Sequence, residues 1–238
     1  MRQIEWHDTI DSTMRRAAEL ARAGCPAGTV VAAREQTAGQ GRLGRTWDSR
    51  PGGLYFTIVL RPRLEPAQAP LATLALGLAA ADTLQTFCGV ATDLRWPNDV
   101  LIGGRKLAGI LAQLQEGALL AGVGVNVNQR TFPPELAGTA TSLVLETGSE
   151  QDPEFLLSAL AGSIESHLGI LETSGAAAIL RLFEAASSYV TGRRVSVEMP
   201  GGEITGTTAG LTPEGFLLVR SVSGELKTVT AGGVRPAN

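Results

Sequence analysis

The chain is poor in cysteine and histidine and has no long hydrophobic run, and each shortage excludes a class of protein. Its two cysteines, Cys25 and Cys88, lack the CxxC spacing of redox and zinc sites. We therefore expect reduced thiols, as in a cytoplasmic protein, and not a disulfide framework. His7 and His167 stand alone in the sequence, which argues against a histidine-based metal site or catalytic triad. The longest apolar stretch, residues 71–81, is too short to cross a bilayer, so no membrane association is expected.

Lysine is also scarce, although the chain is not short of positive charge. Twenty basic residues stand against 23 acidic ones, for a net charge of −3, whereas a protein that coats nucleic acid usually needs a basic excess. Eighteen of the 20 basic residues are arginine, and only Lys106 and Lys227 are lysine. Because arginine carries nearly all of the positive charge, each lysine that remains raises a question about its role.

The chain does have the composition of an ordinary globular protein, with 238 residues of which 44% are hydrophobic and 18% charged. Apolar periodicity, capping residues and β-branched runs predict the secondary structure. The predicted helices cover residues 14–23, 70–87, 153–173 and 176–189, and the predicted strands cover residues 29–33, 54–60, 94–96, 106–115 and 119–127. A hairpin at Glu116-Gly117 joins the last two strands, and residues 36–53 form a loop.

The character of the sequence changes after Gly192. Short β runs alternate with turn signals at Pro200-Gly201-Gly202, Glu214-Gly215 and Ser223-Gly224, a spacing typical of a small barrel. We therefore predict two domains, one over residues 1–190 and one over residues 191–238.

The segment Gly39-Gln40-Gly41-Arg42-Leu43-Gly44 matches the G-x-G-x-x-G pattern of dinucleotide-binding folds. That interpretation requires a helix to open inside the motif, whereas residues 45–53 continue as a loop. An anion-binding loop fits better, because backbone N–H groups, Arg42 and Arg45 can surround a phosphate or carboxylate while Trp47 offers a flat face to a ring. The simpler alternative is a solvated surface loop whose tryptophan packs on the core, and the sequence leaves it open.

Two further segments place charged groups at the ends of strands. Pro97 stops the strand that ends at Trp96, and Asn98 and Asp99 then present an amide and a carboxylate suited to Mg²⁺, or simply form an Asx turn. Lys106 opens an apolar strand, where its compact ammonium group can reach an anion, or where it only protects a strand edge.

Glycine alternates with valine in the segment Gly122-Val123-Gly124-Val125-Asn126. Glycine within a strand suggests that another group approaches the sheet face closely, with Asn126 as a polar side chain in an apolar wall. A bulged core strand relieved by glycine is the alternative interpretation.

The order of the motifs is more specific than any one of them. The chain carries, in this order, Ser12-Thr13, Gln36-x-x-Gly39-x-Gly41-Arg42-x-Gly44-Arg45-x-Trp47, Trp96-Pro97-Asn98-Asp99, Lys106-Leu107-Ala108-Gly109-Ile110, Gly124-x-Asn126 and Ala140-Thr141-Ser142-Leu143. In this combination the chain resembles the biotin protein ligase family over about residues 8–235. The resemblance implies an α+β fold, with a mixed sheet and flanking helices like those of class II aminoacyl-tRNA synthetases, followed by a C-terminal SH3-like β-barrel.

The resemblance also implies an enzyme that makes biotinyl-5′-AMP from biotin and MgATP and then transfers biotin to a lysine of a carboxylase carrier domain. Arg42 and Lys106 are the implied catalytic residues, which neutralise the biotin carboxylate and the α-phosphate. The implied biotin-binding residues are Ser12, Thr13, Met14, Gln36, Gly39, Gln40, Gly41, Arg42, Lys106, Gly109 and Gly124. The implied ATP-binding residues are Arg45, Trp47, Asn98 and Asn126, and Asp99 is the implied Mg²⁺ ligand.

Four positions depart from the pattern that is usual in the family. Met14 stands where Ser-Thr-Asn has asparagine, Gln40 replaces the first arginine of Gly-Arg-Gly-Arg, and Arg95 replaces the lysine before Trp-Pro-Asn-Asp. Gly233 occupies a position that is usually acidic, which weakens any role for a carboxylate there.

The resemblance names a partner and leaves two alternative functions. The implied partner is a biotin carboxyl carrier protein, such as the acetyl-CoA carboxylase subunit, and residues 122–127 are compatible with a homodimer. Because the catalytic domain begins by about Asp8, specific DNA binding is not expected. The first alternative is a lipoate or octanoate protein ligase or transferase of the same fold, against which Trp-Pro-Asn-Asp argues. The second is a non-catalytic biotin-binding sensor, against which the retention of Arg42, Arg45 and Lys106 argues.

Overall fold

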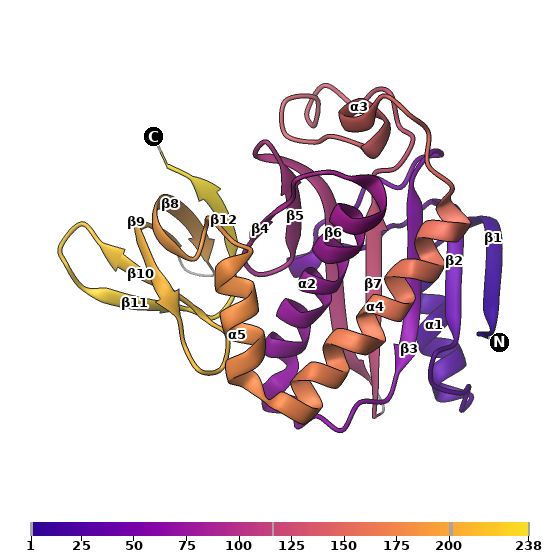
Figure 1. Ribbon diagram of the computed structural model, residues 1–238, viewed down its shortest axis with the longest axis horizontal. Coiled ribbons are helices and arrows are strands. Elements are labelled where there is room, and N and C mark those ends of the chain that lie inside the picture. Colours follow the sequence, from indigo (N-terminus) through magenta and orange to yellow (C-terminus); the bar gives the residue numbers. More distant parts are fainter. Residues whose placement is uncertain (1, 116, 200–201, 238) are drawn as a thin grey trace.

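The computed structural model describes residues 2–115, 117–199 and 202–237, which form two sheets and their covering helices (Figure 1). Glu116 of the predicted hairpin and Pro200-Gly201 of a predicted turn lie outside the described residues. The larger sheet has the strand order β1-β2-β3-β7-β6-β5-β4, and the smaller has the order β11-β10-β9-β8-β12. The strands are β1 (Ile4–Ile10), β2 (Val30–Gln36), β3 (Leu54–Leu60), β4 (Asp93–Arg95), β5 (Asp99–Ile102), β6 (Arg105–Gln115), β7 (Ala118–Val125), β8 (Thr191–Met199), β9 (Gly202–Leu211), β10 (Leu217–Ser221), β11 (Leu226–Val229) and β12 (Gly233–Pro236).

The larger sheet is mixed and carries helices on both faces. Strands β1 and β2 run parallel, and the other neighbouring strands run antiparallel. The helices are α1 (Thr13–Arg22), α2 (Ala69–Cys88), α3 (Leu143–Thr147), α4 (Pro153–Ser174) and α5 (Ala176–Ala185). Because side chains alternate along a strand, Phe56 and Ile58 of β3 join the core under α2 and α4, whereas Val59 packs with Met14 and Ala17 of α1. Helix α1 therefore shares its face of the sheet with the cavity described below.

Helix α2 forms the centre of the main core, where it packs on the sheet and against helices α4 and α5 (Figure 1). Residues 66–88 have the length and hydropathy of a helix that could cross a membrane, yet 67% of the apolar window is buried inside the protein. The helix has apolar residues on nearly all sides and is mostly buried. Both properties are typical of a core helix, as the sequence predicts.

The C-terminal antiparallel sheet packs directly against the larger sheet and α2. Leu217, Val219 and Val234 belong to the same hydrophobic cluster as the residues of α2. The buried Trp96 indole Nε1 donates a hydrogen bond of 2.9 Å to the Gly215 carbonyl oxygen. The two sheets therefore share one continuous core.

The predicted helices and the longer predicted strands are confirmed, with small differences at their ends. Helix α5 ends at Ala185 and not at residue 189, because Ser187 and Ser188 bond instead to β4. Strands β1 and β5 and helix α3 are not among the elements predicted from the sequence. Strand β1 is a half-buried edge strand in which charged residues interrupt the apolar ones, and the other two elements have only four and five residues. Strand β8 begins at Thr191, and the division into domains at residue 190 stays a prediction.

The segment 122–127, considered as a dimer surface, lies inside the protein. Strand β7 pairs with β3 along one edge and with β6 along the other. Both edges are therefore taken within the chain, and this segment offers no strand edge to a second copy. The expectation that residues 122–127 form a dimer surface is therefore not supported by the structure. The homodimer itself stays a prediction.

A substitution at Phe183 of α5 can test whether this helix is part of the main core. Its ring is fully buried and lies near Gly77 of α2. We expect Phe183→Ala to lower the free energy of unfolding by about 3–5 kcal/mol, because it leaves a cavity in close-packed surroundings. The neighbouring Leu182 is 43% exposed, so Leu182→Ala is the matched control and should cost less than about 1 kcal/mol. Equal losses in urea unfolding would contradict the assignment of Phe183 to the core.

Candidate functional site

A cavity of about 820 Å³ lies on the face of the larger sheet that carries α1, between loop 37–50 and strand β12. It is lined by all of the predicted site residues except two. These lining residues are Thr13, Met14, Gln36, Gln40, Gly41, Arg42, Arg45, Trp47, Asn98, Asp99, Lys106, Gly109, Gly124 and Asn126. The fold thus brings together side chains from five separate motifs.

Ser12 and Gly39 are the two predicted residues that do not line the cavity. Ser12 is fully buried, and its hydroxyl oxygen has no hydrogen-bond partner among the described residues. A Cβ atom at Gly39 would lie 2.5 Å from the Trp47 carbonyl oxygen, so glycine is needed for the loop to close on itself. Gly39 therefore contributes to the conformation of loop 37–50, several of whose other residues line the cavity.

Gln36 connects α1 to the glycine-rich loop through hydrogen bonds. Its Oε1 accepts from the backbone N–H and the hydroxyl of Thr13, at 2.8 and 3.0 Å. Its Nε2 donates to the Ser49 hydroxyl at 2.9 Å. These bonds fix the polar end of the cavity next to the α1 N-terminus.

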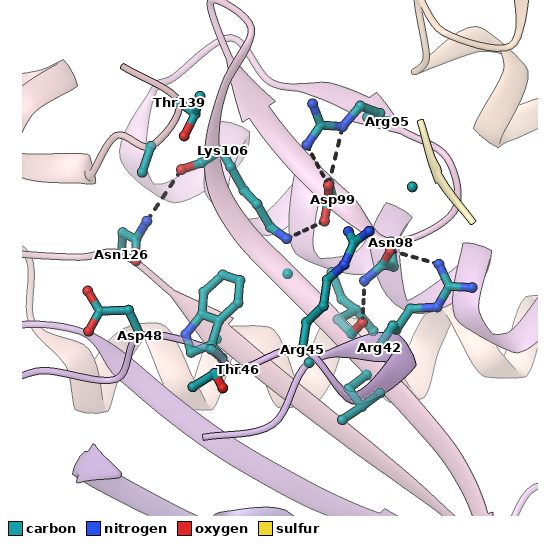
Figure 2. Close-up of a pocket in the computed structure, with 18 of the residues that line it drawn as sticks. Arg42, Arg45, Thr46, Asp48, Arg95, Asn98, Asp99, Lys106, Asn126 and Thr139 are labelled. Atoms are coloured by element: carbon teal, nitrogen blue, oxygen red, sulfur yellow. Dashed lines mark hydrogen bonds and ion pairs between the residues drawn. The ribbon is translucent and has the colours of Figure 1, made fainter. Parts of the chain in front are cut away.

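A largely buried carboxylate flanked by two cations also lines the cavity (Figure 2). Asp99 Oδ1 lies 2.5 Å from Lys106 Nζ, and Asp99 Oδ2 lies 2.7 Å from Arg95 Nη2. Burial acts most strongly on this carboxyl and opposes its ionisation, yet the attraction of Lys106 and Arg95 holds the pKa of Asp99 below its ordinary value. The three groups together carry one net positive charge.

Arg42 brings a further positive charge with only a neutral partner. Its Nη1 donates to the Asn98 amide oxygen at 3.2 Å, and Asn98 Nδ2 in turn donates to the Ile110 carbonyl oxygen at 2.7 Å (Figure 2). Among the described residues, no carboxylate forms an ion pair with Arg42. Burial lowers the pKa of the Arg42 guanidinium, the charge of Asp99 partly offsets this, and repulsion by Arg45 lowers it further. A partly buried cation in this state favours the arrival of an anion.

The Trp47 indole packs on the glycines of the sheet. A Cβ atom at Gly109 or at Gly124 would lie 2.6 Å from atoms of this ring, and one at Gly122 would lie 2.8 Å from the Met14 sulfur. The close approach expected from the glycine–valine alternation is therefore real, and the approaching groups are Trp47 and Met14. Lys106 Nζ also lies 4.9 Å from the centroid of the indole, as a cation–π pair.

The Asn126 side chain forms hydrogen bonds that hold the strand carrying Lys106. Its Nδ2 donates to the Thr141 carbonyl oxygen at 2.9 Å and to the Lys106 carbonyl oxygen at 3.3 Å (Figure 2). The Lys106 N–H donates to the Thr139 carbonyl oxygen at 2.7 Å. The backbone of Lys106 is therefore held from both sides, which directs its side chain toward Asp99.

Part of the cavity wall comes from the C-terminal sheet and from residues after Asn126, none of which is among the predicted site residues. The cavity is also lined by Phe132, Glu135, Leu136 and residues 232–236. Glu198 of β8 lies beside the cavity and forms an ion pair of 2.9 Å with Arg45. Apart from Gly233, no local pattern marks these residues, because only the packing of the two sheets brings them to the loop.

Two family models match the chain. The biotin/lipoate A/B protein ligase family model matches residues 6–129, and the biotin protein ligase C-terminal domain model matches residues 190–234. The first covers more than half of the chain, and the second covers the C-terminal sheet.

Curated relatives and solved structures agree with these matches. The bifunctional ligase/repressor BirA of Bacillus subtilis is 34% identical over 95% of this chain and 72% of its own length. The biotin–[acetyl-CoA-carboxylase] ligase of Mycobacterium tuberculosis is 37% identical over 87% of this chain and 78% of its own. A structure of the biotin protein ligase of Aquifex aeolicus in complex with biotin and ATP superposes over 100% of both chains, with a TM-score of 0.89 and 31% identity.

The packing of Trp47 on the sheet can be tested with Gly124→Ala. The added methyl would overlap the ring, so we expect the indole to leave the sheet and its fluorescence emission to shift to longer wavelength. Overpacking of this kind should cost about 1–3 kcal/mol of stability. Gly138→Ala is the matched control, because Gly138 lines the same cavity and has no atom near its Cβ position. Trp47→Phe identifies the part of the emission due to Trp47, and an unchanged spectrum in Gly124→Ala would contradict the contact.

Proposed function

The chain belongs to the biotin protein ligase family, and we propose that it activates biotin with ATP to biotinyl-5′-AMP and transfers biotin to a lysine of a carboxyl carrier protein. The family models, the named relatives and the solved structures support this reaction. Within the site, the observation that carries the proposal is the partly buried Arg42, which has a neutral partner and faces the same cavity as Lys106.

The first step brings two anions together, and this requires local positive charge. The biotin carboxylate oxygen attacks the α-phosphorus, the bond to the leaving oxygen breaks, and pyrophosphate departs. Arg42 and Lys106 neutralise the carboxylate and the α-phosphate, so that the two groups can approach in line. The Asp99 carboxylate holds the ammonium group of Lys106 in place and is itself paired with Arg95, and Asn98 orients the guanidinium of Arg42.

The remaining cavity residues bind the two substrates. Thr13 and Gln36, with Ser12 behind them, provide hydrogen-bonding groups for the biotin head, and Met14, Gly109 and Gly124 provide an apolar slot. Arg45 binds the ATP phosphates, and Trp47 and Asn126 form the adenosine side of the cavity. Because the indole now packs on Gly109 and Gly124, we infer that it moves aside when the substrates bind.

The second step needs no nucleophile from this chain. The carrier lysine nitrogen attacks the carbonyl carbon of the mixed anhydride, the bond to the phosphate oxygen breaks, and AMP leaves while the nitrogen loses a proton. The cations that neutralised the α-phosphate also stabilise the departing AMP.

The described residues do not fit a Mg²⁺ site built by the protein. Both oxygens of Asp99 already contact cations, and the described part of the chain has no group of three or more acidic, histidine or cysteine side chains able to hold a metal. Mg²⁺ commonly binds mainly through substrate phosphates and water. We therefore assign no step to the metal, and Asp99 as its ligand stays a prediction.

The partner and the location follow from the reaction. We propose a carboxyl carrier protein of an acetyl-CoA carboxylase type as the acceptor, and the cytoplasm as the place of action, because both steps use soluble substrates and the two cysteines are free. A homodimer remains part of the proposal.

The activity is tested by incubating the chain with ATP, Mg²⁺ and each candidate acid in turn. We expect biotin, and neither lipoate nor octanoate, to give an adenylate and then to add its mass to a carrier domain. An adenylate formed only with lipoate or octanoate would support the alternative ligase. Biotin binding without any adenylate would support the sensor.

Removal of the cavity cations should slow adenylation far more than it weakens folding. We expect Arg42→Ala and Lys106→Ala each to lower the rate of biotinyl-5′-AMP formation by about 10²–10³, the scale for losing a charge-stabilising donor. Lys106→Arg should recover little of this rate, because a planar fork replaces a compact ammonium group. Arg105→Ala is the matched control, since Arg105 precedes Lys106 and pairs at the surface with Glu146. Near-normal rates in both alanine variants would exclude the proposed roles.

A further inference from the structure

The side chain of Arg45 extends from the glycine-rich loop to the C-terminal sheet. Its Nη2 donates to Glu198 Oε2 on β8 at 2.9 Å, although the two residues are far apart in the sequence. Both side chains are at least half exposed, at 50% and 63%. Arg235 of β12 lies farther from the same carboxylate, at 3.8 Å. The Glu198 carboxylate therefore pairs mainly with Arg45.

The strand register explains why Glu198 can reach this arginine. Glu198 of β8 is the cross-strand partner of Gly233 on β12. A Cβ atom at Gly233 would lie 3.0 and 3.1 Å from the two Nη atoms of Arg45, so the guanidinium rests over the position where a side chain is missing. Gly233 does not have a positive φ, so its backbone does not require glycine. A carboxylate at either member of this cross-strand pair could contact Arg45.

Arg45 also needs a tether for an electrostatic reason. Its charge repels that of Arg42, which lies on the same short turn and lines the same cavity. A half-exposed arginine without a partner would relieve this repulsion by turning toward solvent. The carboxylate of Glu198 supplies the opposing attraction and holds the guanidinium at the edge of the cavity.

We propose that Glu198 is a positioning residue, which acts through Arg45 to hold the phosphate-binding guanidinium over the cavity and so couples the C-terminal sheet to ATP binding. The proposal rests on the function proposed above. In this chain the carboxylate comes from β8, at the partner position of Gly233, and not from residue 233 itself. Only one nitrogen of the Arg45 guanidinium is used by Glu198, so the others remain available to phosphate oxygens.

The test compares steady-state adenylation in Glu198→Gln with the wild-type chain. We expect the KM for ATP to rise about two- to fivefold, the scale of an exposed ion pair, with little change in the KM for biotin or in kcat. The difference should shrink at high salt, because ions screen exposed pairs. Glu225→Gln is the matched control, since Glu225 immediately precedes β11 of the same sheet and its carboxylate pairs only with Lys227 among the described residues. Thermal unfolding of each variant checks that the fold is intact.

A second variant separates a role in positioning from a purely structural one. Gly233→Glu, added to Glu198→Gln, returns a carboxylate to Arg45 from the partner strand, and we expect it to bring the KM for ATP back toward the wild-type value. An unchanged or lowered KM for ATP in Glu198→Gln, or a failure of the double variant to recover it, would overturn the proposal. If the wild-type chain made no biotinyl-5′-AMP at all, the proposed function itself would fail.

Discussion

Positive charge held in a partly buried cavity is the constraint on which the rest of the site depends. Arg42, Arg45, Arg95 and Lys106 line the same cavity, and like charges at such separations repel unless an anion compensates them. Asp99 pairs with two of them and Glu198 with a third, which leaves Arg42 with a neutral partner. The cavity is thus prepared for anionic substrates, and the joining of a carboxylate to a phosphate is the chemistry that most needs such a place.

The second constraint is the absence of side chains on one face of the sheet. Gly109, Gly122 and Gly124 lie on neighbouring strands, and their missing Cβ atoms leave room for Trp47 and Met14. The Trp47 indole therefore packs directly on the backbone of these strands and covers this part of the sheet face. This links the sequence of two strands to the position of a tryptophan about 60 to 80 residues earlier in the chain.

The two sheets act on the site together. The hydrogen bond from Trp96 to Gly215 and the shared hydrophobic cluster fix the C-terminal sheet against the motif that contains Asn98 and Asp99. With the sheets fixed in this way, strand β12 closes one side of the cavity and Glu198 reaches Arg45. The small C-terminal sheet is therefore part of the site, although it supplies none of the predicted site residues.

The sequence by itself determined the main helices and strands, the change of character after Gly192, and the motifs that resemble one family. Those features are local, since periodicity, turns and motif spacing are written in consecutive residues. From the sequence, only the resemblance to the biotin protein ligase family placed Lys106, Asp99 and Trp47 in a common site. The sequence could not show that Arg95 and Lys106 both pair with Asp99, or which groups approach the glycines of β7. Only the tertiary structure decided these points and brought Glu198 opposite Gly233, because strand register and sheet packing set contacts between residues that are distant in the chain.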